Sequence, residues 1–154
     1  MSVICWDGTT LAADRRASTG SQAYTVQKIC RLGDRLVGFV GTANRMPELC
    51  AWLKKGAKPK TYQKMSAEDD SAMVVIHRNG AIHSYDGSPY PIVIVGTHFA
   101  DGSGCDYARA ALYLGCTAEK AVEVASQFDP FCGNGVDTLT FDAPKRRTRR
   151  RTKR

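Results

Sequence analysis

Three tight-turn signals constrain the fold of this chain more than any other feature, because each one joins two strand-like runs into a hairpin. They are Asp7-Gly8 between residues 2–6 and 9–14, Gly33-Asp34 between 28–32 and 35–39, and Asn79-Gly80 between 72–77 and 81–85. Asn-Gly and Asp-Gly favour short hairpin turns, and we expect a two-residue type I′ turn at Asp7-Gly8. Such a chain is predicted to fold around antiparallel sheets.

A first helix is predicted at 43–55, where apolar side chains recur at helical spacing. Thr42 or Asn44 can cap its start, and Gly56 can end it. Residues 54–64, which contain five lysines, a glycine and a proline, indicate an exposed connection.

The second half of the chain indicates two more strands and two more helices. Residues 91–97 form a continuously apolar run that predicts a short strand buried on both faces. Helices are expected at 104–114 and 118–127, the latter capped by Thr117, and a last strand at 136–141. Hairpins, a helix, more strands, two helices and a final strand predict an α+β fold with two antiparallel sheets and helices outside them.

Composition narrows the protein class. The 154 residues match one domain, and 43% hydrophobic residues are too many for a disordered chain. The apolar runs have the length of strands, well below the roughly 18 to 20 residues of a spanning helix, so no membrane association is expected. No secretory signal is visible at the start. Six cysteines could form disulfides in a secreted protein, but reduced thiols in a cytoplasmic protein fit this sequence better.

The positive charge is concentrated at the C-terminus. We expect a domain at 1–143 followed by a basic, disordered tail at 144–154. The tail has eight cations and no acid, so the net charge of +7 leaves the rest of the chain close to neutral. The tail could bind nucleic acid, dock an acidic protein, or be only a solvated extension. Its cations are Lys145, Arg146, Arg147, Arg149, Arg150, Arg151, Lys153 and Arg154.

Five local motifs, in order along the chain, resemble those of the β-type proteasome subunits and the bacterial HslV-type ring peptidase. The motifs are Thr10-Leu-Ala-Ala-Asp-Arg-Arg-Ala-Ser18, Val26-Gln-Lys-Ile-Cys-Arg-Leu32, Gly38-Phe-Val-Gly-Thr-Ala-Asn44, Gly102-Ser-Gly-Cys-Asp-Tyr-Ala108 and Asp129-Pro-Phe-Cys-Gly133. The resemblance spans roughly residues 2–141. It implies an N-terminal-nucleophile hydrolase fold, a four-layer αββα sandwich with two antiparallel sheets between helix layers, and assembly into rings.

The sequence departs from the family pattern at several positions. The family nucleophile is an N-terminal threonine, and Ser2 is the candidate here. The first hairpin is about four residues shorter than the family's. An even deletion keeps the same side chains facing inward. Two family serines near the active site correspond to Cys105 and Cys132, and the loop before Cys105 is longer than in the family. The basic tail has no counterpart.

Ser2 combines a hydroxyl with an α-amine once Met1 is removed, which the small residue after Met1 favours. An α-amine has a reference pKa near 8, so it can act as general base while the hydroxyl attacks a carbonyl. The alternative is that Ser2 is only a frayed terminal residue. The resemblance implies that Lys28 lies beside Ser2 and lowers the proton affinity of the amine and hydroxyl, while Asp14 keeps Lys28 charged and oriented. An ordinary ion pair at the end of a sheet is the alternative.

Other residues have supporting roles in this hypothesis. The backbone N–H of Gly41, just before a helix, can stabilise an oxyanion, although a turn alone could require this glycine. The resemblance implies that Asp129 and Cys132 support the terminal amine, and Arg16 could assist Asp14.

Cys5 lies within a strand and is predicted to be a core residue rather than a nucleophile. His77, His83 and His98 lack a metal-ligand spacing, so neither a metal nor a cofactor is expected. No phosphate-binding loop is present, so any energy-dependent unfolding of substrates would need a separate ATPase.

The sequence thus predicts a peptidase of the proteasome β type, which hydrolyses peptides or unfolded proteins inside a homo-oligomeric ring. An inactive proteasome-like scaffold that binds nucleic acid through its tail is the main alternative, and an amidase acting on small amides is another.

Overall fold

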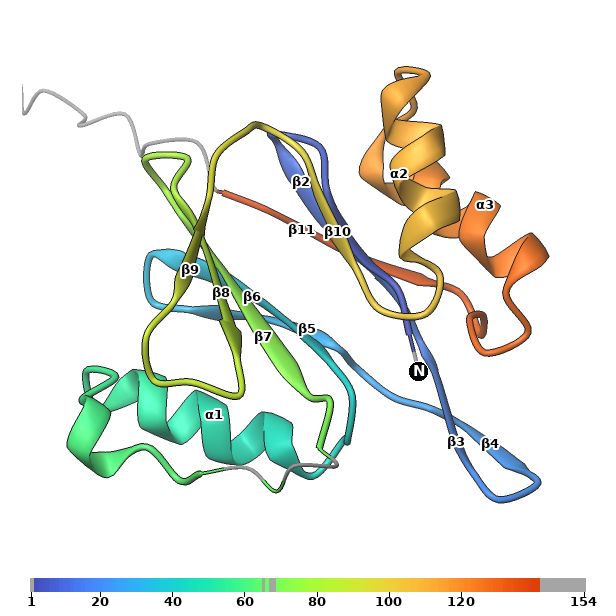
Figure 1. Cartoon of the computed structure of the whole chain (residues 1–154). Coiled ribbons are helices and arrows are strands. Elements are labelled where there is room, and N and C mark those ends of the chain that lie inside the picture. Colours follow the sequence, from blue (N-terminus) through green and yellow to red (C-terminus); the bar gives the residue numbers. More distant parts are fainter. Residues whose placement is uncertain (1, 65, 67–68, 142–154) are drawn as a thin grey trace, which may run out of the picture.

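The computed structural model describes residues 2–64, 66 and 69–141, and their helices and strands form four layers (Figure 1). One sheet has the strand order β10-β1-β2-β11, and the other has the order β5-β6-β7-β8-β9. Their strands are β1 (Ile4–Trp6), β2 (Thr10–Asp14), β5 (Ile29–Leu32), β6 (Arg35–Val40), β7 (Ala72–His77), β8 (Ile82–Asp86), β9 (Ile92–Ile94), β10 (Phe99–Asp101) and β11 (Val136–Thr140). All their pairings are antiparallel.

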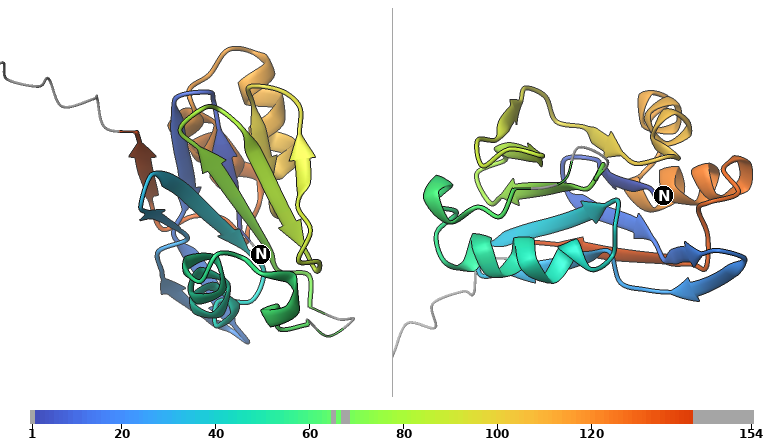
Figure 2. Two further views of the ribbon diagram at one scale, coloured as in Figure 1. Left: turned by 90° about the vertical axis from the view of Figure 1, so that its left-hand side faces the viewer. Right: turned by 60° about the horizontal axis from the view of Figure 1, so that its bottom comes forward.

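Helices cover the outer faces of both sheets. Helix α1 (Arg45–Lys54) lies on the five-stranded sheet, whereas α2 (Cys105–Tyr113) and α3 (Ala118–Phe128) lie on the four-stranded one (Figures 1 and 2). A short 3-10 helix at Pro59–Thr61 follows α1. The arrangement is the predicted α+β sandwich with two sheets between helix layers.

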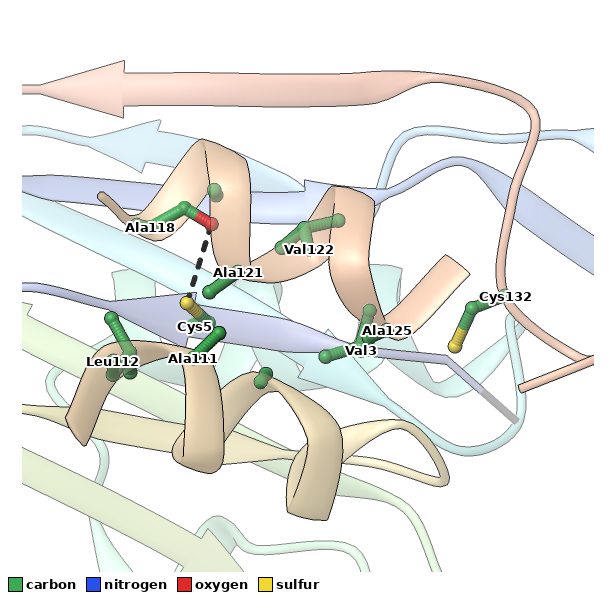
Figure 3. Close-up of a cluster of buried hydrophobic side chains, with 11 residues drawn as sticks. Val3, Cys5, Ala111, Leu112, Ala118, Ala121, Val122, Ala125 and Cys132 are labelled. Atoms are coloured by element: carbon green, nitrogen blue, oxygen red, sulfur yellow. Dashed lines mark hydrogen bonds between the residues drawn. The ribbon is translucent and has the colours of Figure 1, made fainter. Parts of the chain in front are cut away.

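Each boundary between layers has its own hydrophobic core. Between the sheets lie side chains such as Ile4, Leu11 and Ile76, all fully buried. Between α1 and its sheet lie residues that include Trp52 and Val75. The third cluster is made of small side chains from β1, β2, α2 and α3 (Figure 3). Small residues allow two helices to approach the sheet closely, which brings the start of β1 against the helix layer.

Cys5 belongs to this third core, as its position within a strand predicted. Its side chain is fully buried, and its thiol donates to the Ala118 carbonyl at 3.4 Å (Figure 3). Burial, together with the nearby charge of Asp7, raises the pKa of the Cys5 thiol to about 12. Cys5 is therefore a neutral core residue.

The first turn differs from the prediction. Trp6 pairs with Leu11, so the loop is two residues longer than a turn centred on Asp7-Gly8 would allow. The Asp7 carboxylate accepts hydrogen bonds from the backbone N–H groups of Thr9 and Thr10, and from that of Ala118 at the start of α3. Asp7 therefore organises the turn and caps a helix. The shift of two residues leaves the inward-facing side chains unchanged.

The prediction of a strand buried on both faces at 91–97 is wrong. Strand β9 spans Ile92–Ile94 and lies at the edge of its sheet, with Ile92 57% and Val93 60% exposed. A continuous apolar run indicates a strand but does not reveal whether both faces become covered.

Three strands were not predicted, namely β3 (Arg16–Thr19), β4 (Gln22–Thr25) and β10. The first two form a hairpin that extends beyond the sandwich at the end where the N-terminus lies (Figures 1 and 2). The other predicted helices and hairpins are present. Thr117 caps α3 by accepting from the Lys120 N–H, whereas Asn44 precedes α1 without a side-chain capping bond.

Candidate active site

Asp14 is the centre of a buried polar cluster at the end of β2. Its carboxylate is fully buried and accepts four hydrogen bonds. Oδ1 accepts from the backbone N–H of Val3 at 2.9 Å and from Lys28 Nζ at 2.7 Å. Oδ2 accepts from the N–H groups of Arg16 at 3.0 Å and Gly133 at 3.1 Å. A buried carboxylate with four donors is held in one orientation, so Asp14 fixes the chain start relative to Lys28.

Lys28 precedes β5 and is almost fully buried, with its ammonium also donating to the Arg16 carbonyl at 2.5 Å. Burial lowers the pKa of Lys28, because a charged amine loses hydration, and the hydrogen bond and charge of Asp14 offset part of this effect. Arg16, which we expected to assist Asp14, takes part in the cluster through its backbone N–H and carbonyl. The cluster thus places the Lys28 ammonium in a pocket that Ser2 also lines.

Ser2 is held by a glycine-rich loop that precedes α2. The Ser2 N–H donates to Ser103 Oγ at 3.1 Å, and the Gly104 N–H donates to the Ser2 carbonyl at 3.2 Å. A Cβ on Gly102, whose φ is +96°, would lie 2.1 Å from the Ser2 carbonyl oxygen. Only glycine fits there, so the loop and the Ser2 backbone are matched in shape.

The expected place of Cys105 in the site is wrong, and Ser103 occupies the position that we had assigned to it. The thiol of Cys105 lies 3.9 Å from Asp106 at the start of α2, whereas the Ser103 hydroxyl contacts both backbone groups of Ser2. The motif Gly102-Ser-Gly-Cys105 contains both residues. The motif alone does not indicate which of the two faces Ser2, because the need for glycine at position 102 arises from its contact with the Ser2 carbonyl.

Asp129 and Cys132 lie behind Ser103. Cys132 Sγ donates to Asp129 Oδ2 at 3.3 Å, and the Ser103 hydroxyl also bonds to Asp129. Burial alone would raise the pKa of Asp129, but the bonds from Ser103, the Phe131 N–H and Cys132 outweigh it and lower the pKa. Burial and the charges of Asp14 and Asp129 raise the pKa of Cys132 to about 12, so Cys132 is a neutral donor. Asp129 is therefore linked to the backbone nitrogen of Ser2 through hydrogen bonds of the Ser103 hydroxyl.

Gly41 lies at the end of β6, before α1, in a left-handed conformation with φ +95°. A Cβ here would lie 2.4 Å from the Ser71 Cα, so the backbone requires glycine. The Ser71 hydroxyl accepts a hydrogen bond from the Thr42 N–H at 2.8 Å, and the backbone N–H of Ser71 donates to the Asp69 carboxylate. These bonds fix the loop that carries Gly41.

Ser2, Lys28 and Gly41 line one pocket of about 530 Å³. The pocket lies between the β3–β4 hairpin, β6 and α1, whose Met46 and the loop residue Thr42 complete part of its wall. The size is within the range of ligand sites in proteins. The structure thus brings together the residues proposed as nucleophile, cation and oxyanion donor.

The remaining predicted residues fall outside this cluster. His77 and His83 lie side by side, with Nε2 and Nδ1 3.3 Å apart, and His98 contacts Thr97. The described part of the chain contains no cluster of three or more side chains suited to bind a metal. Nor do the described residues include a helix long and apolar enough to cross a bilayer. The basic residues from Lys145 onward lie outside the described residues.

Comparison with curated proteins supports one family, although no protein-family model matches the chain. The chain is 28% identical over 177 residues to proteasome subunit beta 1 of Thermococcus kodakarensis, covering 92% of this chain and 86% of the relative. It is 26% identical to proteasome subunit beta 2 of Pyrococcus abyssi, covering 92% and 84%.

Solved structures share the fold. Thiobacillus denitrificans BPH aligns with a TM-score of 0.68 at 19% identity, covering 94% of this chain and all of that one. Eukaryotic HslV from Trypanosoma brucei aligns with a TM-score of 0.64 at 21% identity, covering 92% and 99%. Together, the proteasome relatives, the solved structures and the shared sandwich fold support a proteasome/HslV-type family of N-terminal-nucleophile hydrolases for this chain.

Proposed function

We propose that this protein is a peptidase in which Ser2, after removal of Met1, is the N-terminal nucleophile. The single observation that carries the proposal is that Ser2, Lys28 and Gly41 line the same pocket. Of the hydroxyl residues that line this pocket, Ser2 is the buried one, and Lys28 is the only buried lysine among the described residues.

The proposed reaction begins with a proton transfer. The α-amine of Ser2 takes the proton from the Ser2 hydroxyl, directly or through a water, while the hydroxyl oxygen attacks the peptide carbonyl. Lys28 favours the deprotonated forms of both groups because its positive charge lies beside them. Before Met1 is removed the Ser2 N–H already donates to Ser103 Oγ, and a free amine at this nitrogen keeps that partner.

The Gly41 N–H stabilises the negative charge that develops on the carbonyl oxygen. The amine then returns its proton to the departing amine of the substrate, leaving an acyl ester on Ser2. Water attacks this ester while the same amine accepts a proton from the water; the acyl–Oγ bond then breaks, the carboxylic acid product leaves, and the amine returns the proton to Ser2 Oγ. Asp14 holds Lys28 in place, and the Asp129–Ser103 contact orients the nitrogen of Ser2.

Assembly into a ring is part of the proposal. Proteins of the proteasome/HslV family form ring assemblies and act on peptides. In this chain, Val95, Tyr113 and Leu114 are 97%, 91% and 80% exposed, and large apolar side chains on a surface are typical of interaction sites. Sedimentation should therefore yield a particle several times larger than 16.8 kDa. A separate ATPase remains the expected source of unfolded substrate.

The test compares hydrolysis of a fluorogenic peptide panel by the natural chain and by two variants. Ser2→Ala should lower the rate at least about 1000-fold with assembly intact. Ser18→Ala is the matched control, because Ser18 lines the same pocket but is an exposed residue of the β3–β4 hairpin. Epoxomicin, which is present in a complex of Thiobacillus denitrificans BPH, should inhibit the natural chain. Unchanged hydrolysis by Ser2→Ala would refute the assignment, and cleavage of small amides alone would indicate an amidase.

We also propose that the basic tail binds polyanions such as nucleic acid. This is the function expected if the protein is an inactive proteasome-like scaffold. The observation that favours it is the run of eight cations without an acid after Pro144. Removal of residues 144–154 should abolish binding of DNA or RNA at low salt, because phosphate contacts supply such affinity. If filter binding is the same with and without the tail, this second proposal is wrong.

A further inference from the structure

Two cysteines from different layers of the sandwich lie next to each other. Cys30 is on β5 and Cys50 is on α1, and their sulfur atoms are 3.7 Å apart. Both are half-buried, and both pack at the margin of the core between α1 and its sheet. They lie 20 residues apart in the sequence.

We propose that Cys30 and Cys50 are a redox-sensitive pair that forms a reversible disulfide between β5 and α1 when the protein meets a peroxide. The sulfur atoms of a disulfide are about 2 Å apart. Rotation of the two side chains can shorten the present 3.7 Å separation to this length, because the two thiols already face each other. The other described cysteines have no such partner. Cys5 donates to a carbonyl, Cys132 to Asp129 and Cys105 to Asp106.

The chemistry balances with hydrogen peroxide as the oxidant. One of the two thiolates attacks a peroxide oxygen, which breaks the O–O bond and leaves a sulfenic acid and, after protonation, one water. The second thiolate attacks the sulfenic sulfur, so that the S–S bond forms, the S–O bond breaks and a second water leaves. Two thiols and one peroxide thus become one disulfide and two waters. A dithiol reductant reverses the bond by exchange.

The local charges set the rate of this reaction. Burial, and then the neighbouring Cys50, raise the pKa of Cys30 to about 12, so little of its thiolate exists at neutral pH. Lys54, one helical turn after Cys50, acts in the opposite direction because its charge favours the thiolate. The pair should therefore oxidise slowly near neutral pH, faster as pH rises, and more slowly when Lys54 is replaced by glutamine.

A disulfide between Cys30 and Cys50 would restrict the movement of two segments that line the pocket. Cys50 follows Met46 by one helical turn, and Cys30 follows Lys28 by two residues, and both Met46 and Lys28 line the pocket. A covalent bond there would fix α1 against β5 and remove the freedom of these two walls to move apart. The bond itself does not depend on hydrolysis, so its test is separate from that of the proposed function.

The experiment uses the complete chain, treated with hydrogen peroxide, blocked with a thiol reagent and digested without reduction. We expect one cross-linked peptide pair containing Cys30 and Cys50, with the loss of two hydrogen atoms, and its disappearance with dithiothreitol. Cys50→Ser should abolish it, whereas Cys116→Ser, which removes another half-buried thiol, should not.

The proposal is overturned if the natural chain retains two blocked thiols at these positions after oxidation, or if Cys30 is oxidised to the same extent in Cys50→Ser without a cross-link. Mapping of the natural chain gives this answer even if a variant fails to fold. Oxidation should also raise the thermal midpoint of the natural chain and leave that of Cys50→Ser unchanged.

Discussion

Replacement of Asp14 by alanine is the sharpest test of the polar cluster. The carboxylate is fully buried, and its removal leaves three backbone N–H groups and the ammonium of Lys28 without their acceptor. Lys28 is only 9% exposed through its side chain, so solvent replaces little of the lost interaction. Removal of one partner of a buried ion pair typically costs about 3–5 kcal/mol. For a chain of this size, that is roughly 6–20 °C in the thermal midpoint.

The assay is urea unfolding followed by tryptophan fluorescence at fixed protein concentration. A control is Asp137→Ala, which removes a partly exposed ion pair between Asp137 and Arg15 at 3.5 Å and should change the stability by less than about 1 kcal/mol. Lys28→Met completes a double-mutant cycle. The double variant Asp14→Ala/Lys28→Met should cost less than the sum of the single changes, because no unpaired ammonium remains. A loss below about 1 kcal/mol in Asp14→Ala, or strict additivity, would refute the reasoning.

Two further predictions concern the effect of replacing Gly41 on stability and the dependence of stability on pH in acid. Gly41→Ala should lower the stability by at least about 2 kcal/mol, because a Cβ overlaps Ser71 and φ is positive. Gly56→Ala has a similar φ of +90° in open space and serves as the control in the same melts, and equal losses would argue against the overlap. The folded-state pKa of Asp129 is below its ordinary 3.8. The stability that ionised Asp129 contributes is therefore fully present above its ordinary pKa of 3.8. It is lost as the pH falls through the lower folded-state pKa. Urea unfolding of Asp129→Asn should thus depend less on pH below about 4 than that of the natural chain, and equal slopes would contradict the assignment.

Local signals explain the parts of the fold that the sequence predicted. Gly33-Asp34 forms a two-residue loop with Leu32 paired to Arg35, and Thr117 caps α3 through its own side chain. Each depends only on neighbours within a few residues. The prediction of the turn after β1 was wrong because the Asp7 carboxylate also accepts a hydrogen bond from Ala118, more than a hundred residues away. No local pattern contains that partner.

Strand pairing between distant segments caused the other differences. Strand β10 has only three residues and exists because Phe99–Asp101 pairs with β1. The exposure of β9 follows from its place at the edge of the sheet, which the apolar run at 91–97 does not determine. Propensity and periodicity carry little information about such non-local choices.

The candidate site residues were named through the resemblance of short motifs to the family, and their catalytic roles stay a prediction. Ser2, Asp14 and Lys28 come from three segments that meet at one end of the sandwich. Ser103 was missed because the sequence offers it and Cys105 in one short motif, and only the packing of Gly102 and Gly104 against the chain start separates them. Such packing depends on tertiary contacts.

The central claim is that Ser2 provides both the nucleophilic hydroxyl and the basic amine. The most direct measurement is mass spectrometry of the N-terminal peptide from the purified, assembled protein. We predict a peptide that begins at Ser2 with an unmodified α-amine. A peptide that retains Met1, or whose amine is blocked, would place the proposed base in an amide bond and contradict the account.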